Sequence, residues 1–170
     1  MGYRGHVTKR KNRGNAHLEV DDMSSPDILS THTRTPIATD DRSALAALAF
    51  TGRIGLSAIF LISGAGKVAA PTATIAFIAS AGLPFPRLAY GTSVVVELLG
   101  GLALFAGFRV RWVAAALAAF CVATAFSFHA HFADQNQLMH FLKNISMAGG
   151  MLQVIALGGG RFSVDAWRRT

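Results

Sequence analysis

Four long apolar runs dominate the sequence after residue 43. They cover approximately residues 44–67, 88–108, 112–130 and 139–158. Each run is about 20 residues long, the length that a helix needs to cross about 30 Å of hydrocarbon. The runs lack the polar–apolar alternation of barrel strands, and only helices or closed barrels satisfy their backbone groups in lipid. The sequence therefore predicts an all-α fold, a four-helix transmembrane bundle.

The first 43 residues differ sharply from the remainder. They hold seven of the 16 Lys/Arg residues and six of the nine Asp/Glu residues, without apolar periodicity. Such a composition buries too little apolar surface to fold alone. We expect a disordered polar tail at 1–43, a four-helix membrane domain at 44–160 and a basic C-terminal segment at 161–170.

The net charge of +7 does not indicate nucleic acid, because the basic residues flank the apolar runs instead of forming a stripe with interleaved aromatics. Outside the runs, twelve of fourteen Lys/Arg residues fall on the side of the two termini. Loops rich in Lys and Arg stay in the cytoplasm, which predicts that both termini are cytoplasmic. Between the first two runs, Ile75, Phe77 and Ile78 predict a short interfacial helix.

A few polar residues lie inside the runs, where a charge costs at least about 2.5–3.5 kcal/mol and normally faces a partner. At 1.5 Å per residue, Glu97 lies close to the membrane midplane, between Arg53 on one side and Lys143 on the other. We therefore predict that Glu97 is the counter-ion of Arg53 and Lys143. The candidate intramembrane polar cluster is Arg53, Glu97, Lys143 and Asn144, with Lys67 and His140 at its periphery.

That cluster has two interpretations. Buried charges inside a membrane mark functional sites by default, and this one could hydrogen-bond a ligand or relay protons. A buried ionic network also serves to hold helices in register. The residues alone leave both interpretations open.

Metal and thiol chemistry are weaker hypotheses. His129, His131, Asp134 and His140 gather near one connection, but loop histidines with this spacing are more often solvated than bound to metal. A haem held by His129 and His140 is less favoured still. Cys121 is the single cysteine, so no intramolecular disulfide forms. We expect no metal site.

The order of polar residues resembles the DoxX family of small four-helix membrane proteins. The matching stretches are RIGLSAIFLISGAGK (53–67), AGLPFP (81–86), VVVELLGGLALFAGFRVR (94–111) and HFLKNISMAGGMLQVIALGGGRFSVD (140–165). The resemblance implies a multi-pass protein of the bacterial cytoplasmic (inner) membrane. Some members are linked to quinone-dependent redox complexes, such as thiosulfate:quinone oxidoreductase or a terminal quinol oxidase, and others are accessory proteins. By position, the family-like polar residues are Arg53, Lys67, Glu97, Lys143 and Asn144.

The leading hypothesis is therefore a subunit or accessory of a quinone-linked membrane redox system, with a quinone as candidate cofactor and no catalytic residue assigned. Its partners would be the lipid bilayer and other subunits of such a complex. The alternative is a non-enzymatic assembly or scaffold protein whose buried charges only fix helix packing. A small transporter is disfavoured, because the sequence has neither inverted repeats nor paired broken helices.

Overall fold

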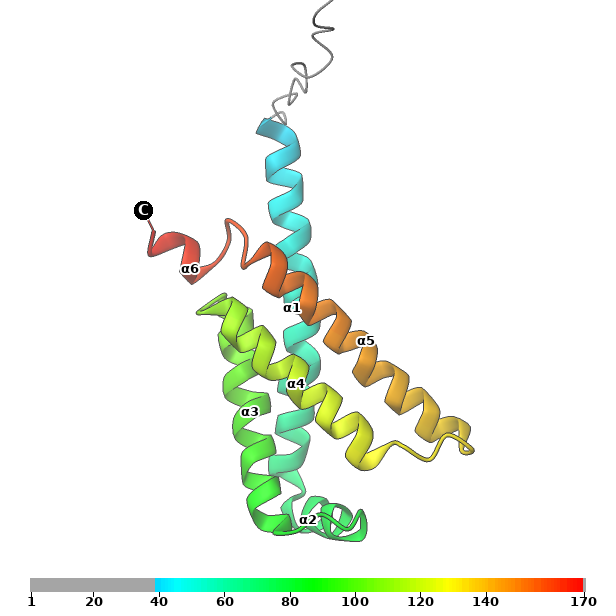
Figure 1. Cartoon of the computed structure of the whole chain (residues 1–170). Coiled ribbons are helices and arrows are strands. Elements are labelled where there is room, and N and C mark those ends of the chain that lie inside the picture. Colours follow the sequence, from blue (N-terminus) through cyan, green and yellow to red (C-terminus); the bar gives the residue numbers. More distant parts are fainter. Residues whose placement is uncertain (1–38, 170) are drawn as a thin grey trace, which may run out of the picture. The chain divides into compact units, whose positions relative to one another are not determined.

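The computed structural model describes residues 39–169, which form helices joined by short connections (Figure 1). The helices are α1 (Thr39–Ala69), α2 (Pro71–Ser80), α3 (Pro86–Ala106), α4 (Val110–Phe128), α5 (Gln135–Leu157) and α6 (Val164–Trp167). No strand occurs in this part of the chain. The prediction of an all-α fold is confirmed for it.

The helix boundaries depart from the sequence analysis at the N-terminal side. Helix α1 begins at Thr39, so residues 39–43 of the predicted polar tail are helical. The remainder of that tail, residues 1–38, lies outside the described residues. The short helix expected between the first two runs is present as α2, with Pro71 in its first turn. Proline suits that position because its missing N–H would be unpaired there.

Three of the helices are long and apolar enough to cross a membrane. The spans are Arg42–Ala69, Pro86–Ala106 and Val110–Phe128. Helix α5 has 23 residues, enough for a crossing, but it is not among these apolar spans, and it contains Lys143, Asn144 and Gln153. Length and composition therefore support three of the four predicted spans, and the fourth stays a prediction.

Helix pairs adjacent in the bundle are α1 with α3, α3 with α4, and α4 with α5 (Figure 1). Their shared core includes the fully buried side chains of Leu104, Leu117 and Met151. Helix α1 approaches α3 closely at Gly64, where a Cβ atom would lie 2.8 Å from the side chain of Leu98. Small residues allow such close approach, which is a main source of helix association in lipid.

The segment after α5 folds back onto the middle of α1 and the start of α4. We call residues 158–163 the C-terminal loop. The buried guanidinium of Arg53, on α1, donates hydrogen bonds to the carbonyls of Gly159 and Phe162 in this loop. Just beyond it, the carboxylate of Asp165 accepts from the backbone N–H of Arg109 at 2.7 Å and of Val110 at 2.8 Å. The predicted basic C-terminal segment thus caps α4 and is held by α1.

Candidate functional site

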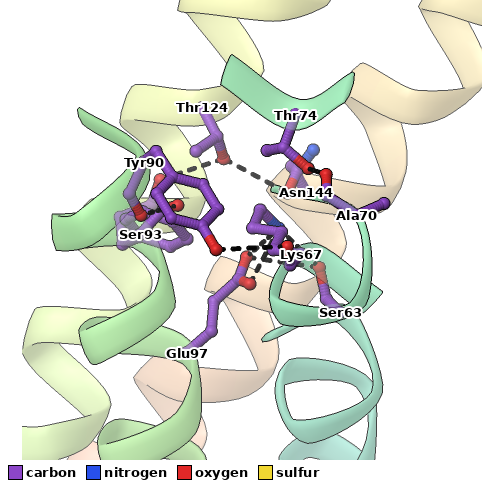
Figure 2. A network of polar contacts seen from close by, with 10 residues as sticks. Ser63, Lys67, Ala70, Thr74, Tyr90, Ser93, Glu97, Thr124 and Asn144 are labelled. Atoms are coloured by element: carbon purple, nitrogen blue, oxygen red, sulfur yellow. Dashed lines mark hydrogen bonds and ion pairs between the residues drawn. The ribbon is translucent and has the colours of Figure 1, made fainter. Parts of the chain in front are cut away.

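Glu97 forms an ion pair with Lys67 (Figure 2). Glu97 is on α3 and only 5% exposed, and Lys67 is in the last turn of α1. The Lys67 Nζ atom lies 2.7 Å from Glu97 Oε2 and 2.9 Å from Oε1. Both carboxylate oxygens therefore accept from one ammonium group, which neutralises the charge that the sequence places inside the bundle.

Ser63 completes this contact. Its hydroxyl accepts from Lys67 Nζ at 2.9 Å and donates to Glu97 Oε1 at 3.3 Å. Ser63 and Lys67 are four residues apart, so they lie on the same face of α1 and both meet α3. Sequence analysis missed Ser63, although its spacing from a lysine on a helix was visible.

The predicted pairing of Glu97 with Arg53 is wrong. Arg53 donates instead to carbonyls of the C-terminal loop, at the opposite end of the α1 segment that packs on α3. Fourteen residues separate Arg53 from Lys67, which corresponds to about 21 Å along the helix. Depth estimates for separate helices do not fix how α1 is staggered against α3. That stagger brings Lys67, predicted to be peripheral, to the carboxylate.

Lys143 is not a partner of Glu97 either. Its Nζ atom lies 3.3 Å from Nδ1 of His140, on the same face of α5. Asn144 is buried, and its Nδ2 donates to the carbonyl of His140 at 3.0 Å while its Oδ1 lies 3.5 Å from Thr124 Oγ1. Asn144 thus links α5 to α4, as a polar side chain between membrane helices is expected to do.

The Lys67–Glu97 pair lines a cavity of about 550 Å³. Lys143 and Asn144 line it as well, whereas neither Arg53 nor His140 does. Four of the six residues proposed from the sequence therefore face one space, contributed by α1, α3 and α5. Helix α4 adds Cys121 and Thr124 to the wall.

Aromatic side chains make up much of the remaining wall. They are Phe60, Phe77, Phe85, Phe120 and Phe128. Phe77, on α2, stacks on Phe128, on α4, with ring centroids 5.5 Å apart. The exposed Phe85 and Leu88 lie at the rim, so the cavity is reached from the apolar outer surface of the bundle. The sequence indicated α2 only as an interfacial helix and not as a wall of this cavity.

Two of the histidines, His129 and His140, pack against each other. The rings of His129 and His140 stack with centroids 5.0 Å apart, and His129 Nδ1 lies 2.8 Å from Gln137 Oε1. Lys143 brings a positive charge next to His140, which opposes metal binding. Within residues 39–169, no group of three or more His, Cys, Asp or Glu side chains is placed to hold a metal ion.

Comparison with known proteins places these features in a family. A family model described as DoxX matches residues 48–130. The chain is 34% identical over 113 residues to inner membrane protein YqjF of Escherichia coli strain K12, a match that covers 66% of this chain and 85% of that protein. The chain belongs to the DoxX family. Inner membrane protein YphA of the same strain is a second relative, 31% identical over 132 residues, which are 74% of this chain and 94% of that protein. No solved structure matches significantly.

As a DoxX-family protein with three apolar spans, the chain is a multi-pass protein of the bacterial inner membrane and contacts the lipid bilayer. The family match includes Lys67 and Glu97 and ends before Lys143 and Asn144. The ion pair thus lies in the part of the chain that defines the family.

Proposed function

We propose that this DoxX-family protein is a subunit or accessory of a quinone-linked redox system, with the cavity as the binding site for the quinone ring. The observation that carries the proposal is a Lys–Glu ion pair on the wall of a mostly apolar cavity of about 550 Å³. Small-molecule sites are of this size and combine mostly apolar walls with a few placed polar groups.

The wall residues fit a quinone in chemistry. A quinone ring is flat and apolar, and the faces of Phe77 and Phe128 offer aromatic surface for it. Its carbonyl oxygens need donors, and Ser63, Lys67 and Lys143 carry them. When bound, a quinone would accept two electrons and two protons and become a quinol.

Within this chain, the proposed role of the ion pair is to orient the ligand and hold a proton. Lys67 would donate to a ligand oxygen in place of its present bond to Ser63 Oγ, while Glu97 keeps the ammonium in position. Glu97 can accept a proton, and Lys67 can release one, within hydrogen-bond reach of that oxygen. No metal or thiol pair of the described residues is required for this role.

The test is whether the purified protein retains a quinone. Protein isolated from bacterial membranes in mild detergent should contain quinone, detected by mass spectrometry of its extracted lipids. The paired variant Lys67→Met/Glu97→Gln removes both charges and should lose at least about 90% of it, which corresponds to the loss of one charge-assisted hydrogen bond of roughly 1.5–3 kcal/mol. Arg87→Gln is the matched control, because Arg87 is exposed and outside the cavity wall. Equal quinone in all three samples at the level of contaminating lipid would refute the site.

A scaffold role is the second candidate, and a specific contact favours it. The ion pair joins α1 to α3 beside Gly64, where a Cβ atom would also lie 3.2 Å from Glu97 Cβ. A charge pair at such a close crossing fixes helix register. Wild-type protein that contains no quinone but retains partner subunits, which the paired variant loses, would favour this role.

We also propose that α5 is a fourth span and that both termini are cytoplasmic. Helix α5 packs along α4 more extensively than any other pair among the described helices, and its polar Asn144 is turned into the bundle. Apart from Arg53 and Lys143, twelve of the fourteen Lys/Arg residues then lie on the cytoplasmic side. Alkaline phosphatase fused to the C-terminus should be inactive, while a green fluorescent protein fusion should fluoresce. Active phosphatase would mean that α5 does not cross.

A further inference from the structure

A second cavity, of about 520 Å³, lies where the turn between α3 and α4 meets the C-terminal loop and α6. Four arginines line it: Arg109, Arg111, Arg168 and Arg169. The single carboxylate on its wall is that of Asp165. Four guanidinium charges thus face one carboxylate, in a place separate from the Lys67–Glu97 cavity. We call it the arginine pocket.

Asp165 does little to neutralise these arginines. Its two carboxylate oxygens accept from the backbone N–H groups of Arg109 and Val110, which caps the first turn of α4. Among the described residues, the ion pair that forms is Lys67–Glu97, and none joins an arginine of the pocket to a carboxylate. The backbone amides at the start of α4 are therefore occupied, and the positive charge available in the pocket belongs to arginine side chains.

Neutral groups hold two of the guanidinium groups at the wall. The Arg168 guanidinium lies over the ring of Phe108, 5.1 Å from its centroid. Arg111 Nη2 lies 3.5 Å from the carbonyl of Ala156, a long contact. These partners restrict the side chains and leave their charges uncompensated. A guanidinium presents a planar fork of N–H donors that matches the oxygens of a phosphate.

The surroundings match the surface of a bilayer. Trp112 and Leu157 line the pocket, yet they are 78% and 75% exposed. Trp167, on the neighbouring α6, is also 78% exposed. Tryptophan concentrates at the level of lipid headgroups, where one part of the ring is apolar and the other meets water. The pocket is at the ends of α3 and α4, two helices that span the membrane.

We infer that the arginine pocket binds a phosphate-bearing anion at the membrane surface. Two sources supply that chemistry: the headgroup of an anionic phospholipid, whose acyl chains would lie along Leu157 and Trp112, and free phosphate in the adjacent aqueous phase. Basic pockets between membrane helices have the charge and the position to hold lipid headgroups. This inference is independent of the proposed quinone site, because the two cavities share no lining residue.

Native mass spectrometry of the full chain in an uncharged detergent tests this inference. The probes are phosphatidylglycerol, zwitterionic phosphatidylcholine and inorganic phosphate. Wild-type protein should retain phosphatidylglycerol at least about tenfold more than phosphatidylcholine, since two or more arginines near the headgroup each contribute about fivefold. Arg168→Gln/Arg169→Gln should weaken phosphatidylglycerol binding by about 25-fold, which is about fivefold for each arginine removed. Arg109→Gln, which removes a guanidinium that lines the pocket and bonds to no other described residue, should weaken binding by about fivefold.

Arg161→Gln is the matched control, because Arg161 lies in the C-terminal loop, is exposed, and is outside the wall of the pocket. It should bind within about twofold of wild type, because screening by salt weakens charges that do not touch the ligand. If excess phosphate does not displace the retained phosphatidylglycerol, the bound anion is a lipid headgroup. Phosphate that binds and displaces the lipid identifies the free anion, and still supports the site. Equal retention of both lipids without phosphate binding, or an equal loss in Arg161→Gln, would overturn the inference.

Discussion

Two buried charges in this protein are satisfied in different ways. Arg53 and Glu97 are 2% and 5% exposed, and both come from apolar segments. Arg53 donates to backbone carbonyls of the C-terminal loop, whereas Glu97 pairs with the ammonium of Lys67. Arg53 lines neither cavity, but Glu97 and Lys67 face the larger one.

The difference separates structure from candidate function. Buried carbonyls without donors are costly, so a cation that donates to them stabilises the segment that carries them. Arg53 serves the C-terminal loop in this way, through Gly159 and Phe162, which follow the end of α5. Glu97 holds no loop, and its charge is neutralised by Lys67, which also lines the larger cavity. A buried charge in a membrane span is thus a functional candidate only after its partners have been identified.

The largest expected effect comes from breaking the ion pair on one side. Glu97→Gln leaves the Lys67 ammonium without its counter-ion and should lower the free energy of unfolding by about 3–5 kcal/mol. Adding Lys67→Met should recover part of that loss, because the double variant buries no unpaired charge. A double-mutant cycle of unfolding in detergent measures the coupling, expected to be at least about 1 kcal/mol. Additive losses would mean that the two residues do not interact.

A smaller loss is expected from Arg53→Gln. This variant removes two hydrogen bonds with a charged donor, each of which contributes about 1.5–3 kcal/mol. The unfolded state in lipid also finds partners for these groups, so we expect the free energy of unfolding to fall by only about 2–3 kcal/mol. Because Arg53 and Glu97 share no partner, the stability losses of Arg53→Gln and Glu97→Gln should be additive within about 0.5 kcal/mol. The same unfolding assay on the Arg53→Gln/Glu97→Gln double variant checks it. Strong coupling between the two substitutions would mean that Arg53 and Glu97 belong to one network.

Asp165→Asn tests the contact between the chain just after the C-terminal loop and the start of α4. An amide keeps one acceptor oxygen where the carboxylate offers two, so one of the N–H groups of Arg109 and Val110 loses its partner. The expected loss is about 1 kcal/mol, typical of a lost helix cap. Ser80→Ala is a control, since its hydroxyl bonds only within α2. A loss from Asp165→Asn no larger than that of the control would show that the cap contributes nothing measurable.

The smallest effect is expected at the N-terminal side. Deleting residues 1–38 removes a polar segment that has no apolar periodicity and precedes the family match at residue 48. The unfolding free energy should stay within about 0.5 kcal/mol of the full chain. Membrane fractionation and the same unfolding assay measure the outcome. A truncated chain that fails to insert would place the domain boundary earlier than proposed.

Much of the fold follows from the sequence, because a run of 20 apolar residues is a strong signal. The predicted runs at 88–108 and 112–130 differ from α3 and α4 by about two residues at each end. Burial of Glu97 and of Cys121 was expected from the same runs. These features depend on local composition, which the sequence displays directly.

The pairing of Glu97 depends on more than composition. Arg53 and Lys67 are both cations on α1, and the choice between them depends on how that helix is rotated and staggered against α3. Contacts such as Gly64 with Leu98 determine the stagger, and no periodicity records them. The return of the C-terminal loop to Arg53 was likewise hidden, because its partners are backbone carbonyls, which every residue possesses.

The most direct test of the account measures ligand binding in the two regions with one assay. A short-chain, water-soluble quinone is titrated into purified wild type, Arg53→Gln and Lys67→Met/Glu97→Gln, and binding is followed by calorimetry. Arg53→Gln should bind within about threefold of wild type despite its lower stability. The paired variant should bind at least about tenfold more weakly, through the loss of one charge-assisted hydrogen bond. Weak binding by Arg53→Gln with unchanged binding by the paired variant would contradict the central claim.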